Sequence, residues 1–234
     1  MNHSKLLDQE YRVRRLEELK DTIGDMIVQP QFPCVGAKSA LARDNLKTVV
    51  AHRLDSSWDD LDIHRELLAW AREYRESTDG FRSLAVIFDG PKDLSESEFE
   101  KLMWERIQSM ADKDAWLGQS YDERVSADPK DPHFSLSFGG EAFFVIGLHP
   151  NSSRPARRFS QPALIFNLHD QFERLREEGR YEKMRDTILE RDRKLAGDIN
   201  PMLAKHGESS EARQYSGRKV GEDWQCPFHD RRTK

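Results

Sequence analysis

The sequence predicts an α+β fold: a single domain with a mainly antiparallel sheet of about five strands flanked by helices. Short apolar or alternating runs typical of strands recur between longer charged segments with helical periodicity. Two of the strand candidates are separated by Gly139-Gly140, a hairpin signal that joins antiparallel neighbours. A regular β-α-β alternation with a glycine-rich phosphate loop is absent from the sequence, which argues against a Rossmann fold.

The first two helices follow from apolar spacing and from proline. We expect an amphipathic helix at Leu6–Ile27, where apolar residues repeat at three- and four-residue steps. Pro30 and Pro33 end it, because the residue before a proline disfavours the helical conformation. A second helix is expected from about Val35 to Lys47.

The remaining elements are predicted by the same signals. A helix is expected at Trp58–Tyr74, and Ser95 and Glu98 form a capping-box signature for another. A charged helical region runs from about Gln171 to Leu195, with an interruption at Gly179. The expected strands are Thr48–Leu54, Leu84–Phe88, His133–Phe138, Phe143–Leu148 and Ala163–Leu168.

Composition limits the class of protein. The chain has 234 residues, 34% of them charged, and a net charge of −5, so it lacks the basic footprint of a nucleic-acid binder. Its two cysteines lie far apart, which does not suggest a disulfide scaffold. With no apolar leader and no apolar run of membrane length, we expect a cytoplasmic protein without a membrane segment. Residues 1–30 would form a helix that packs on or leads into a domain at residues 31–234.

Cys34 lies where an apolar turn meets the start of the second expected helix. The first N–H groups of a helix favour negative charge and lower the pKa of a nearby cysteine, so a thiolate is expected there. A thiolate ligates metals, and on haem iron it favours O–O cleavage. The Cys-x-Gly order is similar to haem-thiolate sites, although the pattern is weak. The alternative is that Cys34 is a small buried apolar side chain.

His149 leaves an apolar strand and enters a loop, where a scaffold can aim a functional side chain. Imidazole is a common iron ligand. Arg154, Arg157 and Arg158 follow in the same loop, and guanidinium groups bind carboxylates and phosphates through paired hydrogen bonds. The loop is therefore a candidate anion site, for a haem propionate for example. The alternative is a histidine satisfied by backbone groups beside solvated arginines.

Asn167 and His169 flank Leu168 at the end of a later strand, so both are expected on the same face. If that face walls a pocket, both contact the substrate. Asp170 is equally well explained as an N-cap without any chemistry.

A further polar cluster lies near the C-terminus. It combines guanidinium, amide and phenol donors, which suits a ligand with a carboxylate or guanidinium group, while a surface ionic network is the alternative. The cluster consists of Arg213, Gln214, Tyr215 and Arg218.

The sequence contains no Cys-x-x-Cys pair, so a structural zinc site is not expected.

Six segments of the chain carry a combined signature: Phe32–Cys34, His149–Arg154, Asn167–Phe172, Asn200–Met202, Gln214–Arg218 and Cys226–Phe228. Taken together, they resemble the YqcI/YcgG family over nearly the whole chain from about residue 30. Members of this family include haem-dependent N-hydroxylases of specialised metabolism, such as those of guanitoxin and cycloserine biosynthesis. These enzymes act on arginine or related guanidine compounds.

The resemblance implies a protein that binds haem b, activates O2 and hydroxylates a nitrogen of a small amine or guanidine substrate. Cys34 is then expected as the iron ligand, with His149 as the alternative. The sequence holds no flavin motif, so electrons would come from a separate reductase, and the oligomeric state stays open. Residues expected to bind the cofactor or substrate are Arg154, Arg157, Arg158, Arg213, Gln214 and Arg218, and those expected to be catalytic are Asn167, His169 and Tyr215.

Two other functions are compatible with the same residues. One is a non-catalytic haem carrier, or a gas or redox sensor, with the same iron ligands. The other is a cofactor-free module whose charged helices at Trp58–Tyr74 and Gln171–Leu195 bind another protein.

Overall fold

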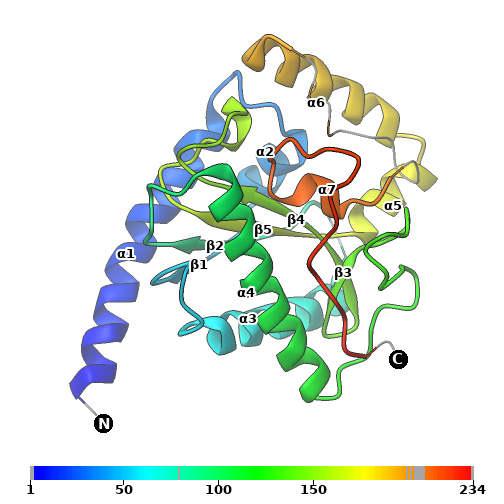
Figure 1. Cartoon of the computed structure of the whole chain (residues 1–234). Coiled ribbons are helices and arrows are strands. Elements are labelled where there is room, and N and C mark those ends of the chain that lie inside the picture. The colour runs from blue at the N-terminus through cyan, green and yellow to red at the C-terminus, as the bar shows by residue number, and fades with distance from the viewer. Residues whose placement is uncertain (1–2, 79, 199, 201, 203–208, 233–234) are drawn as a thin grey trace.

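A mixed sheet runs through the middle of the molecule, with helices on both of its faces (Figure 1). The computed structural model describes residues 3–78, 80–198, 200, 202 and 209–232. The strand order is β1-β2-β5-β4-β3; β1 and β2 are parallel and every other pairing is antiparallel, which confirms the predicted α+β fold. The strands are β1 (Leu46–Ala51), β2 (Ser83–Phe88), β3 (Leu136–Phe138), β4 (Glu141–Leu148) and β5 (Ala163–Leu168).

The helices form two layers around the sheet. α3 and α4 cover one face, whereas α1, α2 and α6 lie on the other (Figure 1). None of the helices in the described part of the chain is both long and apolar enough to cross a bilayer. The helices are α1 (His3–Val28), α2 (Val35–Ala42), α3 (Asp60–Glu76), α4 (Glu96–Trp116), the 3-10 helix η1 (Pro155–Arg157), α5 (Asp170–Glu177), α6 (Tyr181–Ala196) and α7 (Ala212–Tyr215).

Alternation along the central strands divides the apolar residues between two cores. In β2, Leu84 and Val86 point into a large aromatic-rich core beneath α3 and α4. Ala85 and Ile87 point the other way, into a smaller core that α1 closes with Leu19, Ile23 and Ile27. The smaller core lies mainly over β1 and β2 and extends to Leu148 and Ala163, where β4 ends and β5 begins. The candidate site lies on the same face, mainly over the middle of β4 and β5.

Several boundaries differ from the expected ones. The second helix ends at Ala42 rather than Lys47, because Asp44 takes a left-handed conformation with φ of 56°. β1 consequently begins at Leu46, two residues before the expected strand, and is in register with Ser83. α3 is shifted by two residues relative to the prediction, and β3 is shorter than expected. β3 pairs with only the first part of β4, and α7 lies beside the remainder, close to Gly147.

Other local predictions are confirmed. Ser95 and Glu98 form both hydrogen bonds of a capping box at the start of α4. Gly139 and Gly140 have φ values of 59° and 79°, which the tight turn between β3 and β4 requires. Gly179, with φ of 65°, separates α5 from α6. The hydrogen bonds of Ser95 and Glu98 determine where α4 begins, and the positive φ values of the glycines determine the two chain reversals.

Candidate functional site

A cavity of about 270 Å³ lies between α6 and the sheet. One wall carries side chains of β4 and β5, among them Phe144, Ile146 and Ile165, and the opposite wall carries Met184 and Ile188 of α6. These apolar side chains are only half-buried, so α6 does not pack tightly against the strands. Two apolar walls with a gap between them are typical of a small-molecule site.

Cys34 is the N-cap of α2 and lines this cavity. Its Sγ accepts a hydrogen bond from the N–H of Ala37 at 3.3 Å, which confirms the expected position at a helix start. The predicted lowering of its pKa is wrong. Burial raises the pKa of the Cys34 thiol above its usual value, and the N–H groups of Ala37 and Gly36 and the charge of Arg157 reduce this rise without reversing it. The thiol is therefore protonated at neutral pH.

The arginines of the loop after β4 are divided by the short helix η1. In a 3-10 helix, side chains three residues apart lie on the same side. Arg154 and Arg157 accordingly both line the cavity, whereas Arg158 is exposed and does not. The Nε of Arg158 donates to the carbonyl of Ser152 at 2.7 Å, so it supports its own loop.

Arg157 holds together three segments of backbone. It donates to carbonyl oxygens at 3.0–3.1 Å, and its Cγ would lie 3.4 Å from a Cβ at position 217. Among the described residues, no carboxylate lies within ion-pair distance of Arg157, and burial lowers the pKa of its guanidinium to about 10. The cavity therefore contains a cation whose hydrogen bonds go to neutral groups. The three acceptors are the carbonyls of Gly147, Gln214 and Tyr215.

Arg154 ties the loop to α6. It is buried and forms ion pairs with the buried Asp192 of α6 and with the exposed Asp198. Asp192 also lines the cavity. The position of α6 above the sheet is thus held partly by a polar contact at its C-terminal end.

His149 is not part of the cavity wall. Its ring stacks on Phe99 of α4, with centroids 4.4 Å apart and planes inclined by 17°. The residue is 1% exposed, burial lowers the pKa of its imidazole, and its Nδ1 has no hydrogen-bond partner among the described residues. The structure therefore does not bring His149 and Cys34, the two candidate iron ligands, to one place.

The two residues at the end of β5 are separated. Asn167 lines the cavity, and its Oδ1 accepts a hydrogen bond from Ser83 at 2.7 Å. His169 is buried behind the wall, with its Nε2 3.8 Å from Oε1 of Glu211 and 3.7 Å from Oε1 of Glu173. Glu211 itself lines the cavity. His169 is thus adjacent to the site through this carboxylate.

The side chains of the predicted C-terminal cluster point in different directions, because they lie on or beside the short helix α7. Successive side chains of a helix are about 100° apart, and of the residues of α7 only Gln214 lines the cavity. Tyr215 points into the large core and is fully buried. Its hydroxyl donates to the carbonyl of Phe143 at 3.4 Å.

The two outer arginines of the cluster are occupied elsewhere. Arg213 donates to the carbonyl of Gly221 at 2.5 Å and does not reach the cavity. Arg218 donates from Nε to Glu100 of α4 at 2.8 Å and lines an open groove on the other side of α7. Within the segment Asn200–Met202, Asn200 lines the cavity and Pro201 lies outside the described residues.

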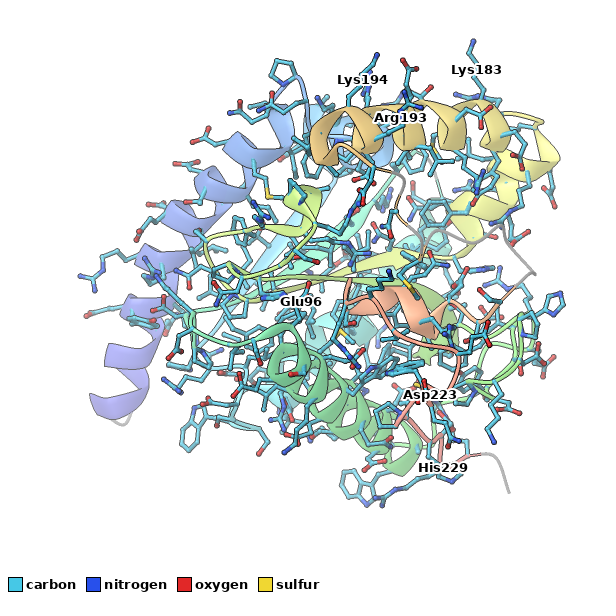
Figure 2. All side chains as sticks on the ribbon, turned by 45° about the horizontal axis from the view of Figure 1, so that its top comes forward. Glu96, Lys183, Arg193, Lys194, Asp223 and His229 are labelled. Atoms are coloured by element: carbon cyan, nitrogen blue, oxygen red, sulfur yellow. The ribbon has the colours of Figure 1, made fainter. Side chains whose placement is uncertain are left out.

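The helix α6 lies within the predicted helical region, but its part in lining the cavity was not predicted. Figure 2 shows that Lys183, Arg193 and Lys194 of this helix point away from the body of the protein. Its inner residues repeat at three- and four-residue steps, a helical signal present in the sequence but obscured by the many charges around it. The α6 residues that line the cavity are Tyr181, Met184, Arg185, Ile188, Leu189 and Asp192.

The protein is a single-domain α+β protein with an apolar internal cavity. The described residues that line this cavity include the thiol of Cys34 and several arginines. The chain belongs to the YqcI/YcgG family, whose model matches residues 23–229. It is 28% identical to uncharacterized protein YcgG of Bacillus subtilis (strain 168) over 164 residues, which is 64% of this chain and 62% of the relative. The chain thus matches less than two thirds of that relative's length. No solved structure gives a significant match.

Proposed function

We propose that this protein is a haem-dependent monooxygenase that hydroxylates a nitrogen of a small amine or guanidine compound, with electrons from a separate reductase in the cytoplasm. The proposal follows from the family resemblance described above. The observation that supports it best is the cavity beneath α6, where the Cys34 thiol faces apolar walls and two arginines. An apolar space with a soft ligand at one side and cations at its edge suits a flat molecule with carboxylate groups.

The residues around the cavity fit haem b in their chemistry. Cys34 would supply the iron ligand, and Arg154 and Arg157 would face the propionates. The described residues contain no group of three or more His, Cys, Asp or Glu side chains able to hold a metal ion, whereas a haem iron needs only an axial ligand from the protein. The space of 270 Å³ lies just below the range of about 300–1,000 Å³ for ligand sites. In this proposal, α6 would therefore move outward when haem binds.

The raised pKa of Cys34 has a direct consequence for this proposal. A thiol that is protonated in the free protein must lose its proton when it becomes a metal ligand, so binding releases a proton and strengthens with pH. The N–H of Ala37 then serves the thiolate, since its hydrogen bond to Sγ already exists. Bound haem b supplies the activation of O2.

Polar groups at the α7 side of the cavity are suited to orient a substrate. The Glu211 carboxylate and the amide groups of Asn167 and Gln214 offer acceptors for an amine or guanidinium group. The walls formed by α6 and the sheet would exclude water from the reacting nitrogen. In this proposal Glu211 joins the site in place of Tyr215, which lies in the core.

The test is a visible spectrum of protein expressed with added haem precursor. We expect a Soret band that Cys34→Ser abolishes or shifts, together with loss of the reduced-CO band characteristic of thiolate ligation. Cys226→Ser is the matched control, because Cys226 packs against the large core and burial raises its pKa to about 12. Product formation is then measured with an amine library, a one-electron reductase and O2.

The outcomes separate the alternatives. A protein without a Soret band contradicts the proposal, and a colourless protein that co-purifies with a partner supports the interaction module. Haem binding without any hydroxylated product supports a carrier or sensor. If Cys34→Ser leaves the spectrum unchanged while His149→Phe alters it, the iron ligand lies on the α4 side of the sheet.

A further inference from the structure

Aromatic side chains connect the cavity with the opposite side of the molecule. Phe144 lines the cavity, and its ring meets Tyr215 edge-on with centroids 5.2 Å apart. Tyr215 in turn stacks on Trp104 of α4, with centroids 5.7 Å apart. Trp104 lines a groove of about 930 Å³ between α4 and the C-terminal segment around Trp224 and Pro227. The series therefore runs from the internal site to an open surface.

The crossing is possible because the sheet is incomplete at this position. β3 pairs only with Glu141–Phe143, so no strand in the described part of the chain pairs with the rest of the outer edge of β4. α7 lies beside that edge, because a Cβ at Gly147 of β4 would lie 3.1 Å from the carbonyl oxygen of Tyr215. The Tyr215 hydroxyl donates to the carbonyl of Phe143, the last β4 residue paired with β3, at 3.4 Å. Tyr215 can thus contact Phe144 on the cavity side and Trp104 on the α4 side.

We propose that Tyr215 and Trp104 carry an oxidising equivalent from the cavity to the groove when the oxidised cofactor does not react with substrate. The inference rests on the proposed function. One electron leaves the indole of Trp104, passes Tyr215 and Phe144, and reduces the cofactor by one equivalent. The oxidised indole keeps its N–H proton. A small thiol in the groove then returns one electron to the indole, releases its own proton to water and is left as a thiyl radical.

The chemistry of the two side chains suits this transfer. Indole and phenol are among the side chains most easily oxidised by one electron, whereas the phenyl rings around them are not. Burial raises the pKa of Tyr215 well above its usual value, so its hydroxyl is protonated before the transfer. When the phenol is oxidised, its proton can shift along the hydrogen bond to the Phe143 carbonyl and return when the electron from Trp104 arrives. The Nε1 of Trp104 is buried and has no hydrogen-bond partner among the described residues, so the oxidised indole keeps its proton.

The test uses the haem-loaded full chain with hydrogen peroxide and no substrate, followed by peptide mass spectrometry. Transfer predicts added oxygen mainly at Trp104, although this residue is only 2% exposed. Peroxide acting from solution would instead oxidise Trp58 and Trp116, which are 77% and 84% exposed. The two exposed tryptophans therefore serve as internal controls.

Variants identify the route. In Tyr215→Phe, which keeps the ring packing, we expect oxidation at Trp104 to fall about tenfold, the effect of ~1.4 kcal/mol on the barrier. In Trp104→Phe we expect faster bleaching of the Soret band by peroxide, because the outlet is removed. Trp58→Phe is the matched control and should change neither signal. A thermal melt of each variant verifies that the fold is kept.

The failures can be told apart. Absence of a Soret band in the wild-type protein overturns both the proposed function and the transfer. A normal Soret band with oxidation at Trp58 and Trp116 exceeding that at Trp104 overturns the transfer alone. Equal oxidation of Trp104 in the wild type and in Tyr215→Phe overturns the assigned route through Tyr215.

Discussion

Gly147 of β4 is the position where one added methyl group should cost the most. A Cβ there would lie 2.6 Å from Cε1 of Phe99 and 3.1 Å from the carbonyl oxygen of Tyr215. Neither neighbour can move easily, since Phe99 is fully buried against His149 and the Tyr215 carbonyl is held by Arg157. The backbone of Gly147 does not have a positive φ, so the cost is steric and not conformational.

The magnitude follows from two opposing effects. Overpacking a core costs roughly 1–3 kcal/mol, while Gly→Ala gains about 0.4–1 kcal/mol through the unfolded state. Because both contacts are with fixed groups, we expect Gly147→Ala to lower the free energy of unfolding by about 2 kcal/mol, or ~4–8 °C in Tm. Urea unfolding followed by circular dichroism measures the loss.

Two further variants test whether the cost at Gly147 is steric. Gly24→Ala in α1 is the matched substitution, since the nearest atom to its Cβ is Cδ1 of Leu41 at 3.9 Å. It should stabilise the protein by about 0.5–1 kcal/mol, because glycine weakens a helix interior. In the double variant Gly147→Ala/Phe99→Leu, the smaller side chain should relieve part of the clash. A fully stable Gly147→Ala protein, or strict additivity with Phe99→Leu, would refute the steric argument.

Three further stability predictions follow from polar contacts. Arg154→Met leaves the buried Asp192 without its partner and should cost about 3 kcal/mol in urea unfolding, whereas Arg154→Met/Asp192→Leu should cost less because neither charge remains. Burial raises the pKa of Asp122, but hydrogen bonds from Arg124 and from the N–H of Ala142 outweigh it and hold the pKa below its usual value. Asp122→Asn should therefore destabilise the protein at pH 7, and this difference should shrink as the pH falls below about 4, the pKa of an unfolded Asp, toward the lower folded-state value. Ser95→Ala removes the capping box of α4 and should cost about 1 kcal/mol in thermal unfolding.

Each of these has a result that contradicts it. The Arg154 argument fails if the double variant is less stable than Arg154→Met. A destabilisation of Asp122→Asn that is constant between pH 7 and pH 3 would mean that the charge of Asp122 does not contribute. Ser97→Ala, on the same exposed turn, is the control for Ser95→Ala, and equal losses in the two variants would exclude a capping effect.

Local signals in the sequence were sufficient for most elements of the fold. The Ser95 capping box, the Gly139-Gly140 turn and the break at Gly179 depend on residues that are close in sequence, and all three are present. The strand and helix boundaries around Asp44 were misplaced, because the left-handed conformation of that residue is not specified by hydrophobic periodicity. The parallel pairing of β1 with β2 is a property of long-range packing and was not visible in the sequence.

The candidate site was only partly predictable, because proximity in sequence does not place side chains on one face. Arg154 and Arg157 share the cavity while Arg158 does not, which follows from the 3-10 geometry of η1. Gln214 lines the cavity and Tyr215 does not, since neighbouring residues of a helix point in different directions. These assignments required local conformations that the motifs alone do not determine. Asp192 belongs to the site only because its helix folds back over the sheet.

A ligand bound in the cavity beneath α6 would couple its affinity to the stability of the protein. A molecule that filled the cavity would cover the half-buried side chains of Met184, Ile188 and Ile165. It would thereby remove apolar surface from water between α6 and the sheet. Occupancy then raises the unfolding temperature in proportion to the logarithm of ligand concentration. Backbone amides of α6 should exchange with deuterium faster than those of β5, and their exchange should slow when a ligand is added. This helix is therefore a reporter of occupancy that needs no knowledge of the reaction.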